Sequence, residues 1–190
     1  MTSQTFKSIF PLLLAITSAF AAGSAPIPRK SPEFTLYETS GKTTLLSSLK
    51  GKVVVMEFLF LKSEHCLRVA KTLNQLQGEM GNRGLQAVGV VFDPPNGPNA
   101  GGQYVTLMVD YFKLTYPVGY SSKADVDLYL GRAPNEVLNI PQVVVIDRNG
   151  VIRATSGGRG GNPKLEDENS LRSLIDGLLQ EGKAGQSVKK

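Results

Sequence analysis

Two continuous apolar runs rich in β-branched residues dominate the first half of the chain, one over residues 53–61 and one over residues 85–92. Runs of this kind are typical of strands that are buried on both faces of a sheet. Between them, apolar residues recur at steps of three and four from Cys66 to Met80, which predicts an amphipathic helix with Ser63 as its N-cap. The order strand, helix, strand predicts a right-handed parallel unit.

Shorter patterns on either side of this unit complete a mixed architecture. Alternating apolar and polar residues predict a hairpin ahead of the unit, and a second hairpin turns at residues 148–150. A breaker-rich loop is expected over residues 93–99. The remaining elements are expected over residues 34–37, 43–45, 104–112, 116–120, 123–130, 142–147, 151–154 and 171–179. The fold class is therefore α/β, with a central mixed sheet flanked by helices and an added N-terminal β-hairpin.

The first 22 residues carry the pattern of a secretory signal peptide. An apolar stretch over residues 9–20 is followed by small residues, and cleavage is expected after Ala21 or Ala22. An uncleaved membrane anchor is the alternative, but about 12 to 14 apolar residues interrupted by Pro11 are fewer than the roughly 20 that a spanning helix needs. The protein is therefore expected to be extracytoplasmic, either periplasmic or secreted, with no stable membrane span after cleavage.

The rest of the chain divides into a linker, one domain and a tail. Residues 23–33 are expected to form a proline-rich, basic linker, residues 34–181 the folded domain and residues 182–190 a disordered tail. A length of 190 residues, 41% of them hydrophobic, is enough for one domain with a sizeable core. The net charge of +5 is spread along the chain without a basic run, and there is no tryptophan, so nucleic-acid binding is not expected.

The segment with the most distinctive chemistry is Ser63-Glu64-His65-Cys66, which holds the only cysteine and the only histidine of the chain. It lies where the first apolar run meets the helix, and the N-terminus of a helix stabilises a thiolate. An exported protein would carry this cysteine unpaired into an oxidising compartment. Glu57 is the one acid inside the first apolar run, and its position there favours burial.

Together these features resemble the thioredoxin-like redoxins, a group that includes the peroxiredoxins and the exported thiol-disulfide oxidoreductases of cytochrome c maturation. The resemblance covers about residues 34–179. It rests on residues 51–58, on the cysteine at the start of the helix and on residues 140–152. It implies a thioredoxin-like fold. It also implies that Pro141 follows a cis peptide bond opposite the thiol and, with Ile140, borders an edge on which a partner polypeptide docks.

Position 63 is where the chain departs from the oxidoreductases of this group. Those proteins carry two cysteines separated by two residues, and Ser63 stands where the first, attacking cysteine belongs. A disulfide within one chain is therefore impossible. Cys66 matches the second, usually shielded thiol, and Glu57 matches the buried acid that relays its proton, since a desolvated carboxylate near a thiol can accept that proton.

Peroxiredoxins offer a second match. Ser63 and Cys66 have the spacing of the hydroxyl and the peroxide-attacking cysteine of that family. Leu59 and Pro141, however, occupy the positions of its proline and of the arginine that lowers the pKa of the thiol. The helix end and a protonated His65 would partly replace that arginine.

The predicted function is that of a thiol-dependent oxidoreductase or antioxidant that acts through Cys66 alone, by a sulfenic acid or a mixed disulfide. Cys66 is the nucleophile, Ser63 orients the oxidant and Glu57 takes the proton, while the partner is a thiol-containing protein or a small-molecule thiol or peroxide. The alternative is a catalytically inactive module that docks peptides near Pro141 and uses Cys66 as core packing. No cofactor is expected, and no metal, because His65 and Cys66 point about 100° apart on a helix.

Overall fold

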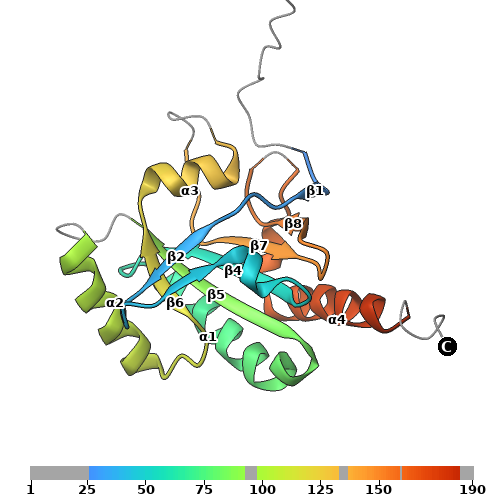
Figure 1. The fold of residues 1–190 in the computed structure, drawn as a ribbon, viewed down its shortest axis with the longest axis horizontal. Coiled ribbons are helices and arrows are strands. Elements are labelled where there is room, and N and C mark those ends of the chain that lie inside the picture. The colour runs from blue at the N-terminus through green and yellow to red at the C-terminus, as the bar shows by residue number, and fades with distance from the viewer. Residues whose placement is uncertain (1–25, 93–97, 133–136, 159, 185–190) are drawn as a thin grey trace, which may run out of the picture.

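The computed structural model describes residues 26–92, 98–132, 137–158 and 160–184. They form one eight-stranded mixed sheet, in the order β1-β8-β7-β4-β5-β6-β2-β3, with helices packed on it (Figure 1). The strands are β1 Arg29–Lys30, β2 Thr35–Glu38, β3 Thr43–Leu45, β4 Val53–Leu59, β5 Leu85–Phe92, β6 Val118–Ser121, β7 Gln142–Ile146 and β8 Val151–Thr155. The helices are α1 Glu64–Met80, α2 Pro98–Phe112, α3 Lys123–Leu130 and α4 Glu168–Ala184, with short 3₁₀ turns η1 Leu46–Leu49, η2 Gly81–Arg83 and η3 Pro163–Glu166.

The strand β4 forms the centre of the sheet. It runs parallel to β5 and antiparallel to β7, and all seven of its residues are buried. Successive side chains point to opposite faces of a strand, so its residues divide between two hydrophobic clusters. One cluster contains residues of α1, α2, η3 and α4, and the other contains residues of α3 and β2. Figure 1 shows α1 and α4 on one side of the sheet and α3 on the other.

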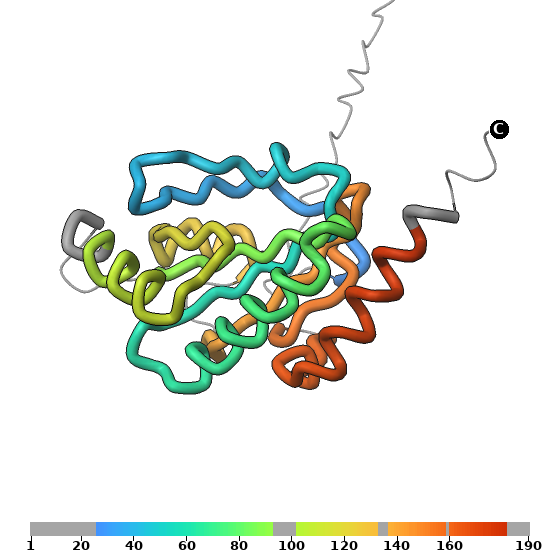
Figure 2. The backbone as a smooth tube through the Cα atoms, turned by 90° about the horizontal axis from the view of Figure 1, so that it is seen from below, coloured from blue at the N-terminus to red at the C-terminus, as the bar shows by residue number. Residues whose placement is uncertain are grey.

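The predicted N-terminal hairpin is present as β2 and β3. It joins the sheet through β2, which pairs antiparallel with both β3 and β6. Figure 2 shows this hairpin, in blue, along the border of the molecule away from α4. The predicted parallel unit is also present as β4, α1 and β5, and the hairpin of β7 and β8 follows it.

Some boundaries differ from the prediction. Residues 29–30 lie in the expected linker but form β1, because they pair with Val151 and Ile152 on the outer edge of β8. A two-residue strand is too short to show any alternation in the sequence. The helix α4 continues to Ala184, past the start of the expected tail, because backbone hydrogen bonds can extend a helix beyond its last apolar residue. The helix α2 begins at Pro98, inside the loop predicted over 93–99 and before the predicted helix start at Tyr104, because proline is tolerated in the first turn of a helix. The predicted signal peptide, the part of that loop over 93–97 and the tail from residue 185 lie outside the described residues.

Within the four described ranges, no helix combines the length and the apolar character needed to cross a bilayer.

Candidate active site

Cys66 lies in the first turn of α1, at the end of the loop that follows β4. Ser63 has an extended backbone and is the N-cap of this helix, as predicted, because its Oγ accepts a hydrogen bond from the Cys66 backbone N–H at 3.3 Å. The Ser63 carbonyl accepts a second bond from the backbone N–H of Leu67 at 3.0 Å. The serine at the position of the missing cysteine therefore holds the helix start that carries the remaining one.

The cap can be tested by its stability. We expect Ser63→Ala to lower the free energy of unfolding by about 1 kcal/mol, the usual cost of losing a side-chain cap. Urea denaturation checks this value. Ser122→Ala is the matched control, since Ser122 caps α3 by accepting a bond from Asp125 N–H at 3.0 Å, and it should cost a similar amount. Only Ser63→Ala should also raise the pKa of Cys66, and equal thiol titration in both variants would contradict the assignment.

The Cys66 side chain is fully buried, with 0% of its surface exposed, in the cluster between the sheet and α1. Burial raises the pKa of the Cys66 thiol above its ordinary value, and the Glu57 carboxyl raises it further. Hydrogen bonds from the Ser63 side chain and the backbone oppose this rise but do not cancel it. The thiol therefore rests protonated at neutral pH, and any nucleophilic role requires an acceptor for its proton.

Glu57 is the acidic group of this site, and its predicted burial is confirmed. Its exposed fraction is 0%, and neither carboxyl oxygen has a hydrogen-bond partner among the residues that the structure describes. Desolvation raises the pKa of Glu57 well above its usual range, with a further rise from the charge of Glu166. Val55 and Leu59, two positions away on either side, belong to the cluster that contains Cys66. Strand alternation therefore places Glu57 on the same face of the sheet as the thiol.

His65 is positioned differently from the sequence-based expectation of a charge partner for Cys66. Its Nε2 lies 3.2 Å from Oε2 of Glu166 at the end of η3, an ion pair whenever the imidazole is protonated. Neighbouring residues on a helix point about 100° apart, so this contact directs the imidazole away from the thiol. Among the described residues, no group of three or more His, Cys, Asp or Glu side chains is arranged to hold a metal ion.

Pro141 precedes β7 and follows a cis peptide bond, as the resemblance implied. It is buried, whereas Ile140 is half-buried and packs against both hydrophobic clusters. The antiparallel pairing of Gln142 with Phe58 brings this bend beside the end of β4, from which the chain continues to Ser63. The bend at Pro141 and the end of β4 that leads to Ser63 are thus neighbours. Docking of a partner at Pro141 and Ile140 stays a prediction.

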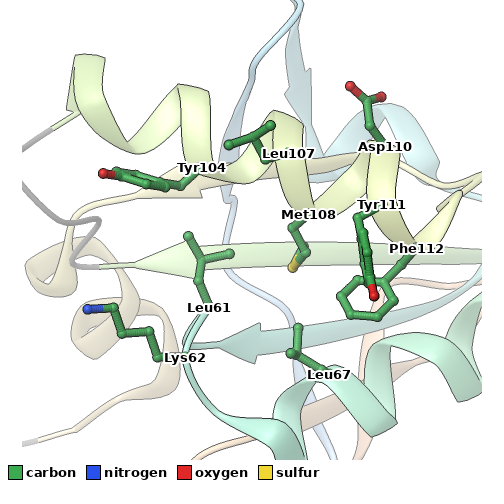
Figure 3. A pocket seen from close by; sticks show the side chains of 9 residues that line it. All are labelled: Leu61, Lys62, Leu67, Tyr104, Leu107, Met108, Asp110, Tyr111 and Phe112. Carbon is green, nitrogen blue, oxygen red and sulfur yellow. The ribbon is translucent and has the colours of Figure 1, made fainter.

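An apolar groove of about 750 Å³ lies beside the site, between the loop after β4, the start of α1 and the length of α2. Figure 3 shows Leu61 and Leu67 facing the side chains of α2 across this space, whereas the Asp110 carboxylate points away from it. This surface was not predicted from the sequence. Its signal was the spacing of the exposed Tyr104, Leu107 and Tyr111 along one stripe of the predicted helix. The lining comprises Leu61, Lys62, Leu67, Tyr104, Leu107, Met108, Asp110, Tyr111 and Phe112.

Comparison with known proteins gives both a family and a fold. The family model described as "AhpC/TSA family" matches residues 27–155. Thioredoxin-like protein YneN of Bacillus subtilis (strain 168) is 24% identical over 143 residues, which are 75% of this chain and 78% of that protein. A thiol:disulfide interchange protein of the thioredoxin family from Chlorobium tepidum TLS superposes with a TM-score of 0.63 at 20% identity, covering 82% of this chain and 99% of that one.

A second solved structure, the thioredoxin domain of a thiol-disulfide oxidoreductase from Bacteroides vulgatus, gives a TM-score of 0.62 at 20% identity. The match covers 80% of this chain and 99% of that one. These superpositions confirm that the fold is thioredoxin-like, as the resemblance implied.

Proposed function

Because the chain belongs to the AhpC/TSA family, we propose that it is an exported thiol-dependent oxidoreductase that works through the single thiol of Cys66. Similar folds occur in proteins described as a thiol:disulfide interchange protein and a thiol-disulfide oxidoreductase, which supports this class of chemistry. The predicted signal peptide supports export to the periplasm or beyond the cell.

The observation that carries the proposal is the buried carboxyl of Glu57 on the same face of the sheet as Cys66. A buried polar group without a partner costs about 1–3 kcal/mol, so it is a poor choice for structure alone. A carboxyl with a raised pKa is, however, suited to exchange a proton with a thiol whose pKa is also raised, because proton transfer is most effective between groups of similar pKa.

The reaction we propose is thiol–disulfide exchange in two steps. The ionised Glu57 carboxylate takes the proton of Cys66, and the thiolate attacks a disulfide RS–SR′, which forms a mixed disulfide and expels R′S⁻, protonated by water. A second thiol then gives its proton to solvent, and its thiolate attacks the outer sulfur of the mixed disulfide. The Cys66 thiolate leaves and takes the proton back from Glu57. One disulfide is consumed and one is formed, so no further oxidant or reductant is needed.

Disulfides fit this site better than peroxide. Peroxiredoxin chemistry relies on a cation that lowers the pKa of the thiol, and the matching position here is the buried, cis-bonded Pro141. The imidazole of His65 is held by Glu166 instead. An extended partner chain carrying the disulfide would dock at the edge bordered by Ile140 and Pro141.

A second candidate is a redox-silent binding module that uses the same edge. The observation that favours it is the complete burial of Cys66, since exchange requires the first turn of α1 to move before any sulfur can reach the thiol. Under this alternative Cys66 only fills the core and Glu57 has no proton to relay.

The reaction of the folded protein with a small aromatic disulfide such as dithionitrobenzoate distinguishes the oxidoreductase from the binding module. We expect one mixed disulfide per chain, formed at a rate that rises with pH, and none in Cys66→Ala. Glu57→Gln should slow the reaction by about a hundredfold, within the usual range for a general base. Ser122→Ala, a substitution far along the chain from the thiol, should react like the wild type. A thiol that reacts only at the rate of global unfolding would instead establish the binding module.

A further inference from the structure

The contact between His65 and Glu166 joins two segments that lie about a hundred residues apart in the sequence. His65 belongs to the first turn of α1 and Glu166 ends η3, and Nε2 and Oε2 are 3.2 Å apart. The side chains are 45% and 20% exposed, so His65 is the more exposed partner and Glu166 the more buried one. The charge of Glu166 also acts on the buried carboxyl of Glu57.

The 3₁₀ turn η3 is built to fix the position of Glu166. Asn162 caps it, with its side-chain oxygen accepting a bond from Lys164 N–H at 3.1 Å, and Pro163 stands at its start. Leu165, the residue before Glu166, is buried in the same cluster as Cys66. The turn packs on β7, where Val143 is the cross-strand neighbour of Glu57. The Glu166 carboxylate is therefore held near the same end of the core as Glu57.

On the other sides of Glu57, no described residue places a cation that acts on its carboxyl. On the opposite side its neighbour is Gly89 of β5, where a Cβ atom would lie 3.5 Å from the ring of Tyr116. The Tyr116 hydroxyl donates to the Ala70 carbonyl at 3.2 Å, and burial raises the pKa of this phenol well above its ordinary value, so it stays neutral.

From α4 the cluster on this face of the sheet receives only apolar side chains, Leu171, Ile175, Leu178 and Leu179. Among the described residues, Glu166 of η3 is the charged group that raises the pKa of Glu57, and Glu57 in turn raises the pKa of Cys66 in α1 and of Tyr116 before β6.

We propose that the ion pair of His65 and Glu166 is a positioning pair that controls whether the Glu57 carboxyl carries its proton. The proposal deepens the function proposed above and rests on it for its catalytic meaning. A bare Glu166 carboxylate opposes the ionisation of Glu57 by like-charge repulsion and keeps its proton in place. A protonated His65 neutralises Glu166 and weakens that repulsion, so Glu57 ionises more readily and can accept the thiol proton.

The direction of each substitution follows from these charges. Glu166→Gln removes the repulsion, so the midpoint of Glu57 ionisation should fall by about one pH unit, the lower end of the range for charges that share a site. His65→Gln leaves the Glu166 charge uncompensated, so the midpoint should rise. The double variant should behave like Glu166→Gln alone, because His65 acts only through Glu166.

The experiment is an infrared pH titration of the C=O stretching band of protonated carboxyl groups in the reduced full-length protein. Glu57→Gln identifies the band by its disappearance. Glu79→Gln is the matched control, since Glu79 pairs with Arg172 and should leave the midpoint unchanged. His65→Gln alters a half-exposed side chain and so tests the proposal even if Glu166→Gln does not fold.

Equal midpoints in the wild type and in Glu166→Gln would overturn the proposal, as would a fall of the midpoint in His65→Gln. A shift in the double variant that differs from that of Glu166→Gln would also overturn it. Because the titration uses no disulfide, its outcome is independent of the exchange reaction. If the Glu57 midpoint shifts as expected but the protein does not react with disulfides, the proposed oxidoreductase function is refuted and the control of Glu57 by the ion pair stands. If the protein reacts with disulfides but the midpoint does not shift, the control of Glu57 is refuted and the oxidoreductase function stands.

Discussion

Replacing Ser63 by cysteine is expected to convert the chain from one without an internal disulfide into an efficient dithiol oxidoreductase. The two sulfurs would belong to residues three apart at the start of α1, where side chains are about 5–6 Å apart at Cβ, a spacing that small backbone adjustments bring within disulfide range. Ser63 is half-buried while Cys66 is fully buried, so the new thiol would be the accessible one.

The new thiol should also be the more acidic one. At the N-cap it would accept the Cys66 backbone N–H that Ser63 Oγ accepts now, and thiols at helix N-termini have pKa values lowered to about 3.5–7.5. The Cys66 thiol has a raised pKa and is largely protonated at pH 7. We therefore expect Ser63→Cys to reduce a protein disulfide such as insulin about tenfold faster or more, since a larger thiolate fraction outweighs the lower nucleophilicity of each thiolate.

The product of this reaction is what distinguishes it from single-thiol exchange. Oxidised Ser63→Cys should lose the mass of two hydrogens and regain it on reduction, because Cys66 attacks the mixed disulfide within the same chain. Ser63→Cys combined with Cys66→Ser is the matched control, which should attack equally fast but stop at the mixed disulfide. If Ser63→Cys stays a free dithiol under mild oxidation while it remains folded, the placement of Ser63 over Cys66 is wrong.

The parts of the fold that the sequence predicted well are those with long, regular patterns. The strand over residues 85–92 and the helix over residues 123–130 have the predicted bounds. In the structure a side-chain cap from Ser122 fixes the start of that helix. The strand at residues 29–30 gave no such pattern. Residues 29–30 form a strand because the edge of β8 supplies backbone hydrogen-bond partners. Their own sequence does not indicate that such a partner is present.

The candidate site shows the same division between local and distant signals. Ser63, Cys66 and Glu57 were recognisable because they lie in one strand–helix junction, and the cis bond at Pro141 was implied by its surrounding motif. Glu166 was missed. Nothing in its own segment marks it, since its part in the site arises only when η3 packs on β7 and meets the first turn of α1.

The burial of Glu57 predicts an unusual dependence of stability on pH. The folded protein keeps the proton of this carboxyl above pH 4.5, the ordinary value for glutamate, whereas the unfolded chain releases it. Folding therefore binds a proton in this range. The contribution of Glu57 to the free energy of unfolding should be largest below pH 4.5 and should fall by about 1.4 kcal/mol for each pH unit above it, until the pH reaches the raised pKa of the folded state.

Glu57→Gln removes this dependence, because the amide matches the protonated carboxyl in shape and cannot ionise. In urea denaturation we expect the variant and the wild type to be similarly stable near pH 4 and the variant to be the more stable of the two at pH 7. Glu79→Gln should show the opposite trend. Hydrogen bonds from Arg172 and Gln75 lower the pKa of Glu79, so the stability that this carboxylate contributes is present above pH 4.5 and is lost as the pH falls.

A stability difference between Glu57→Gln and the wild type that stays constant from pH 4 to pH 8 would show that the carboxyl is hydrated or paired in solution. If the difference instead grows as expected, the wild type retains a residue that weakens its own folded state at neutral pH. Glutamine or leucine would fill the same space at lower cost above pH 4.5, since neither side chain ionises in the unfolded chain. Selection for stability alone gives no reason to keep the carboxyl there, whereas a proton acceptor on the same face as the Cys66 thiol does.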